Sequence, residues 1–168
     1  ELAASAGFDS VKVDTVVIRA VNDDELVPLL KLGQRLGAEV RFIEYMDVGG
    51  ATRWSMQDVV SRQEMLRRLS AQLGPISAVD EDTAAPADRF TLPDGTVFGI
   101  ISSTTEPFCR QCDRSRVTAD GLWYRCLYAR TGTDLRGPLR AGVGANGLRD
   151  LIASIWQARD DRGAEERL

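Results

Sequence analysis

The spacing of apolar residues predicts a strand, a helix and a second strand near the start of the chain. Residues 12–20, KVDTVVIRA, are rich in β-branched side chains, which is typical of a buried strand. A helix follows, and we expect Asn22 to cap it and Gly37 to end it. Residues 39–46, EVRFIEYM, form the second strand. Such a short βαβ unit implies that the two strands lie parallel in one sheet.

A glycine-rich loop, DVGGATRWS, and another helix come next. Ser61 and Glu64 form a capping box, so a helix is predicted over residues 62–73. Residues 80–88, DEDTAAPAD, are acidic and poor in large apolar side chains. They are therefore the predicted linker between two domains.

The pattern changes from parallel α/β to antiparallel after this linker. Two hairpins are predicted, the first over residues 89–103 around PDGT and the second over residues 116–128 around DG. An amphipathic helix near residues 146–160 ends the chain. We therefore expect an α/β unit over residues 1–79 and a small antiparallel α+β unit over residues 89–168.

Composition excludes several classes of protein. The chain has 168 residues, 43% of them hydrophobic, which is enough for one ordinary core and a small appended unit. No apolar run approaches the ~20 residues that span a membrane, and the start, ELAASAGFDS, lacks the features of a signal peptide. A net charge of −4 argues against a nucleic-acid polymer as the partner.

The stretch CRQCDRSRVTADGLWYRC holds all three cysteines, Cys109, Cys112 and Cys126. The chain has no histidine, which excludes Ser-His and Cys-His nucleophile pairs and any zinc site with imidazole ligands. An odd cysteine count without a secretory signal argues against a disulfide framework and favours the reducing cytoplasm.

The cysteine spacing leaves three interpretations open. C-x2-C can point two sulfurs at one metal, and the second hairpin would carry Cys126, expected on its returning strand, back beside them. A [4Fe–4S] cluster held by three thiolates keeps one iron open to a small molecule. A structural zinc would need a fourth ligand such as Asp113, and free buried cysteines are the third interpretation.

Arginines surround this cysteine motif. Residues 109–140 contain seven Arg and three Asp, a local charge of +4 on a chain whose remainder is −8. Arg114 and Arg116 lie two apart on an extended segment, so both can face one pocket and bind an anionic ligand. The plain alternatives are a solvated strand face and a general arginine bias, since the chain has 19 Arg and two Lys.

The stretch FCRQCDRSRVTADGLWYRCLYA resembles the C-terminal cluster motif of the GTP 3′,8-cyclase family, molybdenum-cofactor biosynthesis protein A. The blocks KVDTVVIRAVNDDE, RFIEYMDVGG and IWQARDDRGAEER agree with the same family in colinear order. The resemblance implies a radical S-adenosylmethionine (SAM) lyase. Its reaction is the first step of molybdenum cofactor (molybdopterin) synthesis, the cyclisation of GTP to 3′,8-cyclo-7,8-dihydro-GTP. The implied fold is the C-terminal part of an incomplete (βα)6 barrel followed by the cluster unit.

The resemblance also implies site residues of three kinds, none of them catalytic. The ligands of the C-terminal [4Fe–4S] cluster, whose open iron binds the guanine of GTP, are Cys109, Cys112 and Cys126. The residues that contact GTP are Lys12, Arg41, Arg114, Ser115 and Arg116. Met46 packs against SAM.

Two departures from the family pattern concern the extent of the chain. No Cys precedes Cys109, so the C-x3-C-x2-C motif of the radical-generating cluster is absent, and so is the family's Gly-Gly tail. We therefore expect a C-terminal piece of a longer protein, inactive alone and dependent on the missing half of the barrel. The full-length enzyme would bind SAM and a second [4Fe–4S] cluster, form a homodimer and meet the protein of the next molybdopterin-precursor step.

Two other functions stay open at this point. One is a binding module stapled by zinc or a cluster, without catalytic ancestry. The other is a related radical SAM enzyme with an auxiliary cluster and a different substrate.

Overall fold

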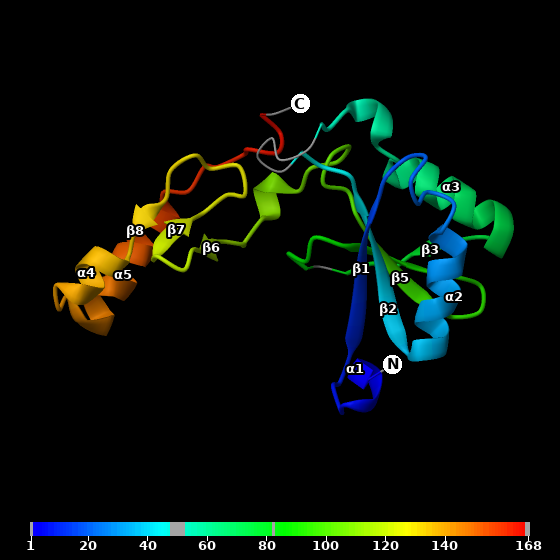
Figure 1. The fold of residues 1–168 in the computed structure, drawn as a ribbon, viewed down its shortest axis with the longest axis horizontal. Coiled ribbons are helices and arrows are strands. Elements are labelled where there is room, and N and C mark those ends of the chain that lie inside the picture. The colour runs from blue at the N-terminus through cyan, green and yellow to red at the C-terminus, as the bar shows by residue number, and fades with distance from the viewer. Residues whose placement is uncertain (1, 48–52, 82, 167–168) are drawn as a thin grey trace. The chain divides into compact units, whose positions relative to one another are not determined.

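The computed structural model describes residues 2–47, 53–81 and 83–166 (Figure 1). The chain divides into two compact units, residues 1–108 and residues 109–168, and each is described by itself. The glycine-rich loop predicted after the second strand falls largely on residues 48–52, outside the described residues.

The first unit is built on a five-stranded mixed sheet in the order β1-β2-β5-β4-β3. Strands β1 and β2 run parallel, β2 and β5 run parallel, and β4 pairs antiparallel with both β5 and β3. The predicted βαβ unit is confirmed, with Val11 opposite Ala38 in the register. The strands are β1 (Val11–Val17), β2 (Ala38–Glu44), β3 (Ser77–Ala78), β4 (Asp88–Thr91) and β5 (Val97–Ile101).

Two helices cover one face of this sheet, as Figure 1 shows. They are α2 (Leu26–Leu36) and α3 (Arg62–Leu73), while α1 (Leu2–Ser5) and the 3-10 turn η1 (Met56–Asp58) are short. Their apolar faces meet the sheet in one core, in which Phe98 is fully buried and stacks on Phe90 at 5.6 Å. Burial of these side chains is the main stabilising contribution to the unit.

Two predictions about the first βαβ unit need correction. The helix begins at Leu26, and Asn22 does not cap it: the Asn22 side chain accepts from the Ile18 N–H and donates to the Val16 carbonyl. Asn22 therefore closes the turn after β1. The first strand was predicted to be buried, but β1 is half-buried, since Val16 is 41% exposed. The reason is that β1 lies at the end of the sheet order.

The boundary between the units lies later in the chain than predicted. The hairpin of β4 and β5 forms as expected, with Gly95 at φ 87° in its turn. Because β5 also pairs with β2, this hairpin belongs to the first sheet. The chain thus divides between Phe108 and Cys109, whereas residues 80–88 connect two strands of one sheet.

The second unit carries a small antiparallel sheet in the order β6-β7-β8. The DG turn predicted between its first two strands is present, with Gly121 at φ 86°. Trp123 of β7 is buried and stacks on Trp156 of α5 at 6.0 Å. Its elements are η2 (Cys109–Gln111), β6 (Arg116–Val117), β7 (Leu122–Tyr124), β8 (Thr133–Asp134), α4 (Arg136–Arg140) and α5 (Gly144–Gln157). Within the described parts of both units, every helix is too short or too polar to cross a membrane.

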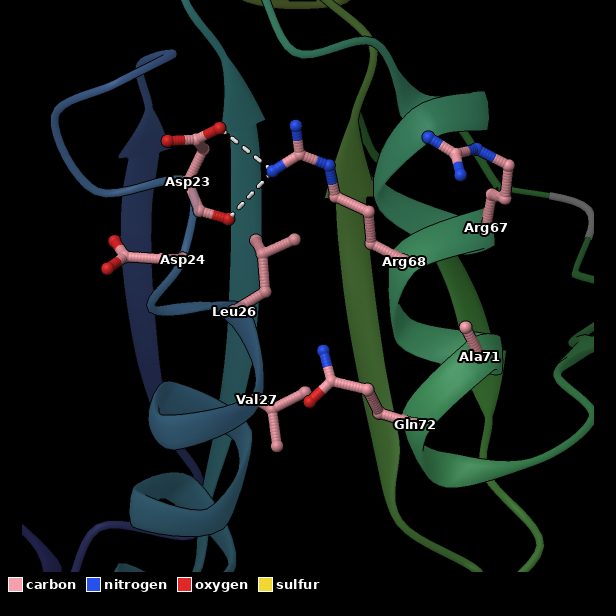
Figure 2. Close-up of a pocket in the computed structure, with 8 residues that line it drawn as sticks. All are labelled: Asp23, Asp24, Leu26, Val27, Arg67, Arg68, Ala71 and Gln72. Carbon is pink, nitrogen blue, oxygen red and sulfur yellow. Dashed lines mark hydrogen bonds and ion pairs between the residues drawn. The ribbon is translucent and has the colours of Figure 1, made fainter.

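An ion-pair network joins the end of β1 to α3. The Ser61 hydroxyl accepts from the Glu64 N–H, which is half of the predicted capping box. The Glu64 carboxylate instead binds Arg19 at 2.7 Å and Arg68 at 2.5 Å. Figure 2 shows Arg68 reaching from α3 to the carboxylate and the backbone carbonyl of Asp23. Hydrogen bonds from Arg19 are the largest cause that lowers the pKa of Glu64, to about 2.

This network predicts an acid-sensitive contribution to stability. Since the pKa of Glu64 is lowered from its ordinary 4.5 to about 2, its contribution is fully present above 4.5 and is lost as pH falls toward 2. Glu64→Gln should cost about 1–2 kcal/mol at pH 7, because the ion pairs are partly solvated, and much less at pH 3. Urea unfolding between pH 7 and pH 3 measures this. The exposed Asp9→Asn is the control, and parallel pH profiles for wild type and Glu64→Gln would contradict the assignment.

Candidate functional site

The first two cysteines lie on one tight turn. η2 begins at Cys109, and the Cys112 N–H donates to the Cys109 carbonyl at 3.3 Å. Both cysteines line a hollow of about 240 Å³. Its other lining residues are Arg110, Arg159, Asp160, Asp161 and Arg162. The C-x2-C turn therefore places both cysteines at one cavity, while their role as metal ligands stays a prediction.

Two arginine side chains donate hydrogen bonds to Cys112. The Arg114 guanidinium donates to Cys112 Sγ at 3.8 Å, and Arg159 Nη1 donates to the Cys112 carbonyl. Burial raises the pKa of the Cys112 thiol, but hydrogen bonds from the Arg114 N–H and from the Arg159 and Arg114 side chains outweigh it, so the pKa lies below its ordinary value. This environment favours the thiolate, the form that binds metals.

Cys126 does not lie on the strand expected for it. β7 ends at Tyr124, and Cys126 sits in the bend that follows. Its Sγ accepts from the Tyr128 N–H at 3.5 Å, and a Cβ added at Gly163 would stand 3.0 Å from it. Within β7, Trp123 is buried and packs on Trp156 of α5, while Leu122 and Tyr124 are half-buried.

One short C-terminal segment passes all three cysteines. Residues 159–162 line the hollow at Cys109 and Cys112, and Gly163 lies against Cys126. The prediction from sequence assigned no role to this segment. The available signal was the run RDDRG, whose two basic and two acidic side chains can form ion pairs beside a polar site.

The three thiols fit a sulfur-held metal group in their chemistry. None forms a disulfide, and thiolate sulfur is the preferred ligand of both iron–sulfur clusters and structural zinc. Within the described ranges, however, no three Cys, Asp or Glu side chains are placed together as a metal-binding group. Convergence of all three sulfurs on one centre therefore stays a prediction.

The two predicted arginines differ in their surroundings. Arg114 precedes β6, is half-buried and contacts Cys112. Arg116 begins β6, opposite Tyr124, and is exposed, as is Ser115. Neither arginine is among the residues that line the hollow at the cysteine pair. Their convergence on one ligand is therefore untested by the geometry.

The other predicted site residues belong to the first unit. Lys12 and Arg41 line one hollow of about 590 Å³, in which Arg41 pairs with Glu39 at 2.8 Å and Arg89 pairs with Glu39 at 3.0 Å. The structure thus brings together the two predicted GTP contacts of this unit. Met46 is half-buried and lies beyond the end of β2.

A fully buried carboxylate organises the carboxyl end of β2, and sequence reasoning missed it. Glu44 accepts from the N–H groups of Arg62, Thr104 and Thr105 at 2.7, 3.0 and 2.7 Å. It also accepts from the Thr105 hydroxyl at 2.6 Å, and its own carbonyl accepts from Ser103 Oγ. The signal in the sequence was weak, because Glu44 shares its strand with Glu39 and Arg41 and differs from them only in lying between Ile43 and Tyr45.

Comparison with known proteins gives the family. Residues 38–165 match the family described as Molybdenum Cofactor Synthesis C. The chain belongs to this family. The match includes β2 with Glu44, the hollow at the cysteine pair, part of the hollow of Lys12 and Arg41, and all three cysteines, so the resemblance seen in the sequence is confirmed.

Several curated relatives of this chain are named GTP 3′,8-cyclases. GTP 3′,8-cyclase 3 of Mycobacterium bovis is 55% identical over 168 residues, which are 100% of this chain and 44% of the relative. GTP 3′,8-cyclase 1 of Mycobacterium tuberculosis is 54% identical over 98% of this chain and 46% of its own length. GTP 3′,8-cyclase of Parasynechococcus marenigrum is 45% identical over 98% of this chain and 48% of its own length. The chain spans about half the length of these relatives.

The Glu44 network makes a prediction about stability. Glu44→Gln keeps the volume but places an NH2 group against N–H donors, so at least one of them loses its partner. We expect the free energy of unfolding to fall by about 2–4 kcal/mol. Urea unfolding at pH 7 measures it, with the exposed Glu25→Gln as the matched control. A loss below 0.5 kcal/mol, on the order of a surface change, would contradict the role given to Glu44.

Proposed function

We propose that this chain is the substrate-binding, iron–sulfur part of a GTP 3′,8-cyclase in molybdenum cofactor biosynthesis. The observation that carries the proposal is the Cys109–Cys112 turn, in which Arg114 and Arg159 donate to Cys112 and the pKa of its thiol lies below the ordinary value. The chain's membership of the family and the names of its relatives support the same function.

The three cysteines would hold one [4Fe–4S] cluster. Cys109 and Cys112 supply two sulfurs from one turn, and Cys126 supplies the third from the bend after β7. When bound, such a cluster offers one iron without a protein ligand, which can accept an electron pair from a substrate atom. Asp160 and Asp161 are close to the pair, but carboxylates are the less common ligands of sulfur-rich sites.

The sparse core of the second unit also favours a metal group. Among the described residues of 109–168, Trp123 is the one buried hydrophobic side chain, and α5 has no buried residue. A unit of this size needs a staple when its core is so small. Metal binding commonly provides one, because its free energy adds to that of folding.

Basic side chains of each unit would bind the anionic groups of GTP. Arg114 lies on the sulfur of Cys112, and Arg116 follows two residues later. Lys12 and Arg41 share the hollow of the first unit, where a phosphate could replace the pairing of Arg41 with Glu39. Met46, beyond the carboxyl end of β2, would pack on SAM.

The remaining length of the relatives would supply the rest of the enzyme. In the proposed full-length protein, the parallel strands β1, β2 and β5 are part of an incomplete (βα)6 barrel. In the proposed full-length enzyme, the second cluster and the SAM-cleaving step would lie in the part of the relatives' length that this chain does not cover. Alone, the chain is proposed to bind GTP without converting it. The homodimer and the protein of the next step are properties proposed for the full-length enzyme.

Nucleotide titration of the anaerobically reconstituted chain tests the proposal. We expect about one [4Fe–4S] cluster per chain and tighter binding of GTP than of ATP. The double variant Arg114→Ala, Arg116→Ala should weaken GTP binding about 10- to 100-fold, because charge-assisted hydrogen bonds are lost.

The matched control is Arg149→Ala, since Arg149 is exposed on α5 of the same unit. Uptake of zinc in place of iron, or equal binding of both nucleotides, would favour a stapled binding module. An unchanged dissociation constant in the double variant would indicate that both arginines lie on a solvated strand face and do not contact GTP.

A further inference from the structure

We propose that Arg159 is a positioning residue that holds the Cys109–Cys112 turn in place for cluster binding. The part of this inference that concerns the cluster rests on the proposed function. The hydrogen bond from Arg159 to the Cys112 carbonyl, called the tether below, rests on contacts within the second unit.

Arg159 reaches the cysteine turn from the end of α5. Its side chain is only 10% exposed, which is unusual for an arginine in so small a unit. Nη1 donates to the backbone carbonyl of Cys112, the last residue of the turn. A hydrogen bond to this carbonyl fixes the peptide plane at Cys112 and thereby the direction of its side chain.

Arg159 is itself held from the opposite side. Its guanidinium lies 4.6 Å from the ring centroid of Trp156, which stacks on Trp123. Asp161 Oδ2 stands 3.6 Å from Arg159 Nε and 3.4 Å from Arg125 Nε. Arg125 Nη1 in turn donates to the Ile155 carbonyl at 3.2 Å. The tether is therefore anchored in the one packed region of the unit.

Two buried atoms of this arrangement have no hydrogen bond among the described residues. They are Arg159 Nε and Asp161 Oδ2, which face each other as an ion pair beyond hydrogen-bond distance. The Arg159 side chain also lines the hollow at the cysteine pair. Groups that orient metal ligands from behind in this manner commonly change metal affinity 10- to 100-fold when they are removed.

The first arm of the test needs no cluster. In the metal-free chain, Arg159→Gln should speed amide hydrogen exchange in residues 109–113 about tenfold, because a hydrogen bond from a charged group is lost. Arg159→Lys keeps the charge but cannot span Cys112, Trp156 and Asp161 together, so we expect an intermediate rate. Arg149→Gln, on the exposed side of α5, should leave exchange unchanged. Equal amide exchange rates in wild type and Arg159→Gln would contradict the proposal that Arg159 holds the cysteine turn.

The second arm uses the anaerobically reconstituted chain and an iron chelator. The cluster should be lost about 10- to 100-fold faster from Arg159→Gln than from wild type and Arg149→Gln. Its electron paramagnetic resonance signal after reduction should also differ from wild type, which a loss of overall stability alone would not cause.

The two arms separate this inference from the proposed function. Wild-type chain that takes up no iron would overturn the proposed function, while the exchange rates still decide the tether. Faster exchange with unchanged cluster loss would overturn the positioning role. Loss of the near-ultraviolet dichroism of the stacked tryptophans in Arg159→Gln would mean that this variant disturbs the packing of the unit. In that case the exchange rates and the cluster loss of Arg159→Lys are compared with wild type instead.

Discussion

The carboxylate of Glu44 is the constraint on which the first unit depends. A charge buried at 0% exposure is tolerated only when donors surround it, and here the donors come from the start of α3 and from residues 104–105 after β5. Glu44 therefore fixes the segments that follow two parallel strands. Met46 lies in one of them, which is the place where ligand sites form in parallel α/β folds.

The second unit lacks a large core among its described residues, and contacts of arginine side chains and of the cysteine turn hold it together instead. Its packed region is the Trp123–Trp156 stack with Arg159 over it, and the cysteine turn is attached to this region through a backbone carbonyl. Gly163 allows the C-terminal segment to approach Cys126, where any larger side chain would meet sulfur and Tyr128. A bound metal group would complete a unit that is otherwise sparsely packed.

Much of the fold is predictable from sequence because local signals carry it. The spacing of apolar residues predicts the βαβ unit. Ser61 predicts the start of α3, and the PDG turn predicts the hairpin of β4 and β5. The boundary at 80–88 was misplaced since pairing of β5 with β2 is a long-range contact that composition does not report. The C-x2-C spacing predicted that Cys109 and Cys112 lie close together, and they lie on one turn. The roles of Glu44 and Arg159 were not predictable, because they depend on donors and acceptors distant in sequence.

Mössbauer spectroscopy of the chain reconstituted with 57Fe tests the central claim most directly. Three cysteine ligands leave one iron of the four open, so added GTP should change the spectrum of one iron site and leave the other three unchanged. ATP at the same concentration should produce a smaller change or none. A cluster whose spectrum is the same with and without GTP would contradict the proposal that GTP binds at a cluster held by this chain.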